Sequence, residues 1–112
     1  MSVECVFCKI IDRAIPVTIV AENDDVLVIQ DRSPKAPVHY LIIPKKHTPD
    51  IVSMTADELP LAQAIFAMAQ QLSRALPGKG DFRLLVNNGS GVGQSVFHLH
   101  AHFLAGKKLA DF

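Results

Sequence analysis

The chain has 112 residues, enough for one domain with its own core, and an apolar fraction of 49% excludes a disordered protein. Its 11 Lys and Arg residues balance 11 Asp and Glu residues, which argues against nucleic-acid binding because such proteins carry a basic excess. All apolar runs are too short for a membrane span and no signal-peptide pattern opens the sequence. We therefore expect a soluble cytoplasmic protein with neither nucleic-acid nor membrane partners.

Hydrophobic patterning predicts an α+β fold in a single domain over residues 1–112, with a five-stranded antiparallel sheet. In chain order the expected elements are a short helix at 7–14, strands at 17–21, 26–30 and 39–43, a long helix at about 56–76, and strands at 82–87 and 97–104. The first two strands flank the polar segment 22–25 and predict a hairpin.

The long helix has a start signal and an unusually wide apolar face. Thr55 and Glu58 fit a capping box, although Pro60 leaves Asp57 as a rival cap. One apolar stripe at helical spacing comprises Leu61, Ile65, Met68, Leu72 and Leu76. Leu59, Ala62 and Phe66 widen this stripe, so they belong either to a broad core face or to a contact with a second subunit.

Three histidines alternate with apolar residues in 97–104, which predicts a strand with all three imidazoles on one face and with Leu99, Ala101 and Phe103 pointing to the core. Alternate residues lie roughly 6.6 Å apart, so His98 and His102 would be about 13 Å apart. Two neighbours could share a zinc ion, but all three could not. A row of imidazoles suits an extended ligand with one reactive centre.

A glycine-rich segment precedes the histidines directly. The glycines of 91–95 allow backbone N–H groups to approach a phosphate closely, and Ser95 adds a hydroxyl group. A glycine-rich loop alone is weak evidence, because Asn88–Gly89 is also an ordinary turn signal. Its position before the histidine row makes it a candidate phosphate cradle.

The motif His98–Leu104 is similar to the signature of the histidine triad (HIT) family, and the resemblance covers about residues 5–106. Further matching segments are Phe7–Ile11, Ile15–Pro16, Asp31–Pro34, Ala36–His39, Ile43–His47, Asn87 and Gly93–Val96. Ser95, and Gly106 followed by a basic residue, resemble the nucleotide-binding phosphoramidase branch more than the dinucleoside polyphosphate hydrolase branch. The resemblance implies the HIT fold and a homodimer in which two subunits form a continuous assembly.

The resemblance also implies the catalytic residues. His100 would attack the α-phosphorus and form a covalent nucleotidyl-histidine, which water then hydrolyses. His102 would contact the phosphate, and His39 would support the nucleophile through hydrogen bonds. Asn87, Gly93 and Ser95 would hold phosphate oxygens or assist the leaving group. Activity of a neutral imidazole nucleophile would fall below roughly pH 6.5.

The remaining nucleotide-binding residues follow from the same resemblance. Asp31 would bind the ribose hydroxyls, although it could instead be a turn cap before Ser33. The base pocket would be lined by Phe7, Ile10 and Leu41, each of which could equally be plain core. Ile29 replaces a common aromatic residue, Arg32 replaces a common apolar one, and the tail 107–112 lacks a Trp-containing segment. These departures leave the base preference and the natural amine open.

The pair Cys5-x-x-Cys8 is by itself compatible with redox chemistry, metal binding or chance. A closed zinc site needs two more ligands. The resemblance to bacterial-type members with this pair implies a structural zinc held by Cys5, Cys8, His47 and His98. His47 could otherwise be a surface residue in a basic loop.

The expected function is hydrolysis of purine nucleoside 5′-phosphoramidates by a homodimer without a catalytic metal. One rival is a metallohydrolase with His98 and His100 on a catalytic zinc, which chelation would inactivate without unfolding. A second is a purine nucleotide-binding scaffold dimer with incidental activity, which would bind nucleotide without turnover. A third is a dinucleoside polyphosphate hydrolase.

Overall fold

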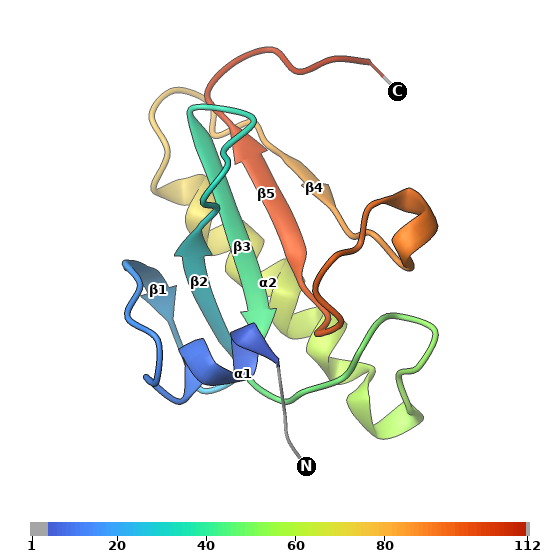
Figure 1. The fold of residues 1–112 in the computed structure, drawn as a ribbon. Helices are drawn as coiled ribbons and strands as arrows, with labels where there is room; N and C mark the ends of the chain where they lie inside the picture. Colours follow the sequence, from blue (N-terminus) through green and yellow to red (C-terminus); the bar gives the residue numbers. More distant parts are fainter. Residues whose placement is uncertain (1–4, 112) are drawn as a thin grey trace.

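The computed structural model describes residues 5–111, so the ends of the predicted domain 1–112 lie outside the described residues. Five strands form one antiparallel sheet in the order β1-β2-β3-β5-β4 (Figure 1). The strands are β1 Ile19–Glu22, β2 Val26–Gln30, β3 Val38–Pro44, β4 Arg83–Leu85 and β5 Ala101–Ala105; the helices are α1 Val6–Ile11 and α2 Pro60–Arg74; the 3₁₀ turns are η1 Ala56–Glu58 and η2 Ser90–Val92. The predicted α+β fold, with one long and one short helix, is confirmed.

The two faces of the sheet carry different layers (Figure 1). The face toward α2 holds the larger core, in which Val28, Met68 and Phe103 are almost fully buried. The opposite face is covered by α1, where Phe7 and Ile10 pack on Leu27 and its neighbours. Because both faces are covered, β2 reads as a continuous apolar run. In the part of the chain that the structure describes, no helix has the length and apolar character that a membrane span needs.

The long helix begins later than the sequence predicts. Thr55 and Glu58 do pair, since the Thr55 backbone N–H donates to Glu58 Oε1 at 3.0 Å, but they bracket the 3₁₀ turn η1 rather than the first turn of α2. Pro60 takes the first position of α2, where its missing N–H costs nothing. The rival cap Asp57 lies inside η1. The helix also ends at Arg74, two residues earlier than predicted.

The last strand is shorter than the predicted 97–104. Its pairing with β3 runs from Ala105 to Ala101, opposite Val38 to Ile42. Before Ala101 the chain leaves the sheet, because the Leu99 N–H donates instead to the Thr48 carbonyl oxygen at 2.7 Å. His98 and His100 therefore precede β5, although Leu99 still enters the α2-side core as predicted.

Several other boundaries also differ. The helix α1 ends at Ile11 rather than 14, because Arg13 adopts a left-handed φ of 65° that ends the helix. The first strand, β1, begins two residues later than the predicted 17, and β4 covers only three of the six predicted residues. Asn23 Oδ1 accepts N–H bonds from Asp25 and Val26, which closes the predicted hairpin.

Candidate active site

His100 is fixed by its own backbone segment in one tautomer. Its Nδ1 lies 2.8 Å from the carbonyl oxygen of His98, and a carbonyl can only accept, so Nδ1 carries the proton. The remaining Nε2 then holds a lone pair. The residue is only 9% exposed and lies on the lining of a cavity. This geometry supplies a buried imidazole nitrogen with a free lone pair, which a nucleophile requires.

His102 is held in the opposite tautomer by a chain of hydrogen bonds that we call the relay: the Lys35 N–H, His39 and His102. The Lys35 N–H donates to His39 Nδ1 at 3.0 Å, so the proton of the neutral His39 ring is on Nε2. That Nε2–H donates to His102 Nδ1 at 2.9 Å. His102 therefore keeps its own proton on Nε2, as a donor for the cavity that it lines.

Asp31 lies beside the relay and also stabilises its own turn. Its Oδ1 accepts from the Ser33 N–H at 2.7 Å, as expected of a turn cap. Its Oδ2 lies 3.5 Å from His39 Nε2. A carboxylate offers about four lone-pair sites, so these contacts leave room for a further donor such as a ribose hydroxyl. The capping role is thus present in the structure without excluding the ligand role.

Burial keeps these histidines neutral at physiological pH. It lowers the pKa of His39, His98 and His100, because burial disfavours the charged imidazolium. Burial, followed by the neighbouring His100 and His39, lowers the pKa of His102 to about 4. The sequence-based expectation that activity falls below roughly pH 6.5 assumed an imidazole with an ordinary pKa. Because burial lowers the pKa of His100 and His102, we expect the loss of activity at a lower pH.

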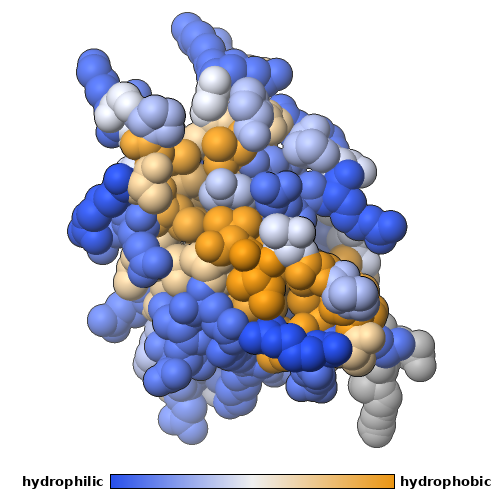
Figure 2. All heavy atoms as spheres, turned by 90° about the vertical axis from the view of Figure 1, so that its left-hand side faces the viewer, coloured by the Kyte–Doolittle hydropathy of each residue, from blue (hydrophilic) through white to orange (hydrophobic). Residues whose placement is uncertain are grey.

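A cavity of about 660 Å³ opens beside the histidines, within the range of small-molecule sites. It is lined by Val6, Phe7, Ile10, Ile15, Pro16, Val17, Ile29, Gln30, Asp31, Arg32, Ser33, Leu41, Asn87, Gly93, Ser95, Val96, His100 and His102. Figure 2 views the molecule from the side of β1 and α1 and shows an apolar band across this face, with polar side chains on either side. The lining thus combines apolar side chains, such as Ile15 and Val17, with polar ones, such as Asn87 and Ser95.

The polar part of the cavity is shaped by the loop between β4 and β5. Gly93 has a φ of 109°, which side-chain-bearing residues rarely adopt. Gln94 is 3% exposed and ties the loop together, accepting from the Gly89 N–H and donating to the carbonyl oxygens of Pro49 and Val96. Within residues 5–111, the side chains of Asn87 and Ser95 make no hydrogen bond, so both are available to a ligand.

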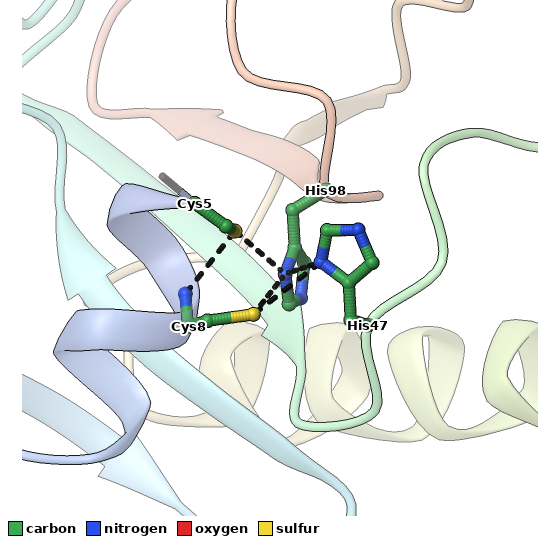
Figure 3. Close-up of side chains that lie close together, drawn as sticks. All are labelled: Cys5, Cys8, His47 and His98. Carbon is green, nitrogen blue, oxygen red and sulfur yellow. Dashed lines mark hydrogen bonds between the residues drawn. The ribbon is translucent and has the colours of Figure 1, made fainter. Parts of the chain in front are cut away.

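A second cluster lies next to the nucleophile, and we call it the metal cluster: Cys5, Cys8, His47 and His98. Figure 3 shows Cys8 of α1 and Cys5, which caps the start of α1, facing two histidines, one from the loop after β3 and one from the segment before β5. Their four ligand atoms lie within 4.8 Å of one another. His98 Nε2 donates to the Pro44 carbonyl oxygen at 2.7 Å, which leaves the Nδ1 lone pair facing the other three groups.

The spacing of the metal cluster fits a tetrahedral ion. Bonds of about 2.0 Å to nitrogen and 2.3 Å to sulfur place donor atoms about 3.3–3.8 Å apart. The observed separations are 3.3 Å for Cys8 Sγ–His47 Nδ1, 3.4 Å for Cys5 Sγ–His98 Nδ1 and 3.1 Å between the two Nδ1 atoms. Without an ion, burial and the neighbouring Cys5 thiol raise the pKa of Cys8 to about 11. The cluster could therefore hold a metal such as zinc.

Asp31, His39 and His102 also bring ligand-type atoms within 4.8 Å of one another. A metal there would need a lone pair on His39 Nε2, but the Lys35 N–H occupies Nδ1 and leaves Nε2 protonated. This group is therefore a hydrogen-bond chain. Among residues 5–111, neither group of candidate metal ligands contains both His98 and His100. This disfavours the rival function in which both histidines bind a catalytic zinc.

The structure brings the candidate site residues into two adjacent groups. Every predicted nucleotide-binding residue lines the cavity, and the four predicted metal ligands form the metal cluster. His39 does not line the cavity; it forms a hydrogen bond to the Nδ1 atom of His102, which does. Several lining residues were not predicted from the sequence, namely Val6, Ile15, Pro16, Val17, Gln30, Ser33 and Val96. The contact of the Lys35 N–H with His39 was not predicted either, because a backbone group makes it and no side-chain motif encodes it.

Comparison with known proteins places this geometry in a family. The model described as the C-terminal binding region of scavenger mRNA decapping enzyme matches residues 4–112. An uncharacterised HIT-like protein of Synechocystis is 45% identical over 108 residues, covering 96% of this chain and 94% of the relative. A HIT family hydrolase from Legionella pneumophila has a TM-score of 0.89 at 40% identity, covering 96% of both chains.

A histidine triad protein from Clostridium difficile has a TM-score of 0.94 at 38% identity, covering 100% of this chain and 98% of the other. These matches extend over nearly the whole chain. The chain belongs to the histidine triad family and shares its fold with HIT family hydrolases.

Proposed function

We propose that the protein hydrolyses purine nucleoside 5′-phosphoramidates through a covalent nucleotidyl-His100 intermediate. The observation that carries this proposal is the pair of complementary tautomers at the cavity. His100 presents a lone pair on Nε2, and His102 presents a proton on Nε2. One atom suits attack on phosphorus and the other suits a developing negative charge on a phosphate oxygen.

The reaction would proceed in two displacements. His100 Nε2 forms a bond to the α-phosphorus while the P–N bond breaks, and the departing amine takes a proton from a donor on the polar wall. Ser95 and His102 are candidate donors among the lining residues. Water then attacks the same phosphorus, the P–His100 bond breaks, and a nucleoside monophosphate is released. Asn87 and the Gly93 region would hold the phosphate oxygens throughout.

The rest of the nucleotide would extend toward the apolar wall. Asp31 retains lone pairs that can accept from ribose hydroxyls. Phe7, Ile10 and Leu41 offer a buried apolar surface for the base. Gln30 and Arg32 are the polar side chains that line the cavity beside Asp31, so they are candidates for contacts that set the base or leaving-group preference.

The proposal is tested by release of AMP from a lysine-linked adenosine phosphoramidate. We expect steady turnover by the native protein and none above background by His100→Ala, with both shown to be folded by circular dichroism. Equal turnover in the two proteins would remove His100 as the nucleophile. Tight AMP binding without turnover in the native protein would favour the nucleotide-binding scaffold, and faster cleavage of a dinucleoside polyphosphate would favour that branch.

The metal cluster is proposed to hold a structural zinc ion. Two thiolates and two imidazole nitrogens complete a closed tetrahedral set with no position left for substrate. The ion would fasten α1 and the loop after β3 to the segment before β5. A zinc site built on two cysteines requires both to stay reduced, as the cytoplasm maintains, so we propose a cytoplasmic location.

A homodimer is proposed from the surface of α2 and its neighbours. Leu59 and Phe66 are 58% and 64% exposed, so the widened stripe is not a core face. Phe82 is also partly exposed, and β4 ends the sheet with an edge that a second β4 could pair with. We expect light scattering to give twice the 12.2 kDa chain mass at micromolar concentration, and Phe66→Glu to give the chain mass. A native monomer would contradict the dimer.

A further inference from the structure

His98 belongs to the metal cluster through its side chain and to the active site through its backbone. Its Nδ1 atom lies 3.4 Å from Cys5 Sγ and 3.1 Å from His47 Nδ1. Its carbonyl oxygen accepts the Nδ1–H of His100, the bond that leaves the nucleophilic lone pair on Nε2. Any displacement of His98 therefore moves the group that selects the tautomer of His100.

Phe7 forms a second connection. It lies on α1 between Cys5 and Cys8, and its side chain is 6% exposed. Its ring meets the His100 ring edge-on, with centroids 5.0 Å apart and planes at 86°, and meets the His98 ring at 5.9 Å and 75°. Edge-to-face packing of this kind restricts ring rotation. The two cysteines therefore flank the residue that packs against the nucleophile.

The position of α1 itself depends on the cysteines. The Cys5 Sγ atom accepts from the Cys8 N–H at 3.3 Å at the start of this six-residue helix. A helix this short is marginal on its own, so its position relies on packing and on external fastening. Close approach of Cys8 Sγ to His47 Nδ1, at 3.3 Å, supplies that fastening when an ion joins them.

We propose that the metal cluster positions the catalytic nucleophile, with Phe7 and the His98 carbonyl oxygen as the positioning groups that connect the cluster to His100. This inference rests on the proposed role of His100 as the nucleophile. It assigns the cluster a function beyond holding the fold together: metal occupancy and nucleotide binding are thermodynamically coupled. Because such coupling is reciprocal, each ligand raises the affinity for the other by the same factor.

The test measures AMP binding by calorimetry in zinc-loaded and chelated protein, and zinc binding with and without AMP. We expect zinc to tighten AMP binding by about fivefold or more, the lower end of typical allosteric coupling, and AMP to tighten zinc binding equally. In Phe7→Leu, which keeps an apolar side chain but removes the ring, this factor should fall below about twofold. The matched control is Ile11→Val, on the same helix but outside the cavity lining, which should keep the full factor.

A structural readout accompanies the binding data. At one fixed pH, ¹⁵N spectra should show His100 wholly in the Nδ1–H form in zinc-loaded protein and as a mixture in zinc-loaded Phe7→Leu. Identical AMP affinity with and without zinc would overturn the proposal. If chelation unfolds the protein, unchanged His100 signals in zinc-loaded Phe7→Leu would overturn it instead. Neither readout requires turnover: coupling without phosphoramidate cleavage would refute the proposed function alone, and cleavage without coupling would refute this inference alone.

Discussion

The metal cluster and the relay each contain two histidines with close polar neighbours but have different hydrogen-bond patterns. In each region, ligand-type atoms lie within 4.8 Å of one another: the four residues of the metal cluster, and the two histidines of the relay with the adjacent Asp31. In the metal cluster, the Pro44 carbonyl oxygen accepts the Nε2–H of His98, so the Nδ1 lone pair of His98 faces the other ligand atoms. In the relay, the Lys35 N–H donates to the Nδ1 lone pair of His39, so the Nε2–H of His39 faces His102.

The difference shows that backbone groups decide what a set of histidines and acids can do. Converging lone pairs require a cation between them, whereas alternating donors and acceptors satisfy one another. The triad histidines contact both regions, since His98 serves the metal cluster and His102 serves the relay. His100 lies between them in the chain and is left with the reactive lone pair.

The largest effect should come from deleting the end of the relay. His102→Ala removes the donor at the proposed phosphate position, and we expect kcat to fall by about 10²- to 10⁴-fold, as for loss of a general acid. Zinc content should be unchanged, because His102 lies outside the metal cluster. Turnover equal to that of the native protein would show that the relay has no catalytic role.

Zinc titration should distinguish the two regions directly. We expect one equivalent per chain, lost in Cys8→Ser and retained in Asp31→Asn. At a thousand times its Kd, a bound ion stabilises the native state by about 4 kcal/mol, so chelation should lower Tm by roughly 10 °C or more. A second equivalent that disappears in Asp31→Asn would mean that the relay is a metal site after all.

The pH dependence should reflect the buried relay. Burial lowers the pKa of His39, and that of His102 to about 4, so both stay neutral below their ordinary value. We expect the midpoint of the fall in kcat/KM to lie below the ordinary imidazole pKa of about 6.5, because burial also lowers the pKa of the nucleophile His100. Activity should be lost by about pH 4, where His102 itself becomes protonated. The unfolded chain binds protons first, so the free energy of unfolding should decrease as the pH falls from about 6.5 toward 4. A rate midpoint at or above pH 6.5 would contradict neutral, buried imidazoles.

The smallest effect should come from the Lys35 backbone. Lys35→Pro removes the N–H that donates to His39 Nδ1, whereas Lys35→Ala keeps it. One hydrogen bond is worth about 1 kcal/mol, so we expect about fivefold slower turnover in the proline variant and no change in the alanine variant. Equal loss in both variants would assign the effect to the lysine side chain.

The predictable part of this molecule is the part that side-chain patterns encode. The alternation of His98–Leu104 predicted which residues enter the core, and Leu99 and Phe103 are buried there. The glycine-rich loop was predicted to be a phosphate cradle; Gly93 and Ser95 do line the cavity, and the phosphate role stays a prediction. The family resemblance predicted that Cys5 and Cys8 share a metal site with His47 and His98. Local sequence spacing alone could not have grouped these four residues, which do lie together.

Backbone geometry accounts for what the sequence did not reveal. The departure of the chain from the sheet before Ala101 depends on the Thr48 carbonyl oxygen, and the tautomer of His39 depends on the Lys35 N–H. Gly106, taken as a branch signal, also has a local reason: its φ is 99°, and a Cβ there would lie 2.9 Å from Pro37. Its presence therefore says less about substrate than the resemblance implied.

The measurement that tests the central claim most directly is identification of the covalently modified residue. Protein mixed with an adenosine phosphoramidate would be quenched in the pre-steady state and mapped by tandem mass spectrometry. The account predicts an adenylyl group on His100 and none on His98 or His102, because His100 alone of the three combines a free lone pair with the cavity lining. Modification of His102, or rapid turnover without any modified histidine, would contradict it.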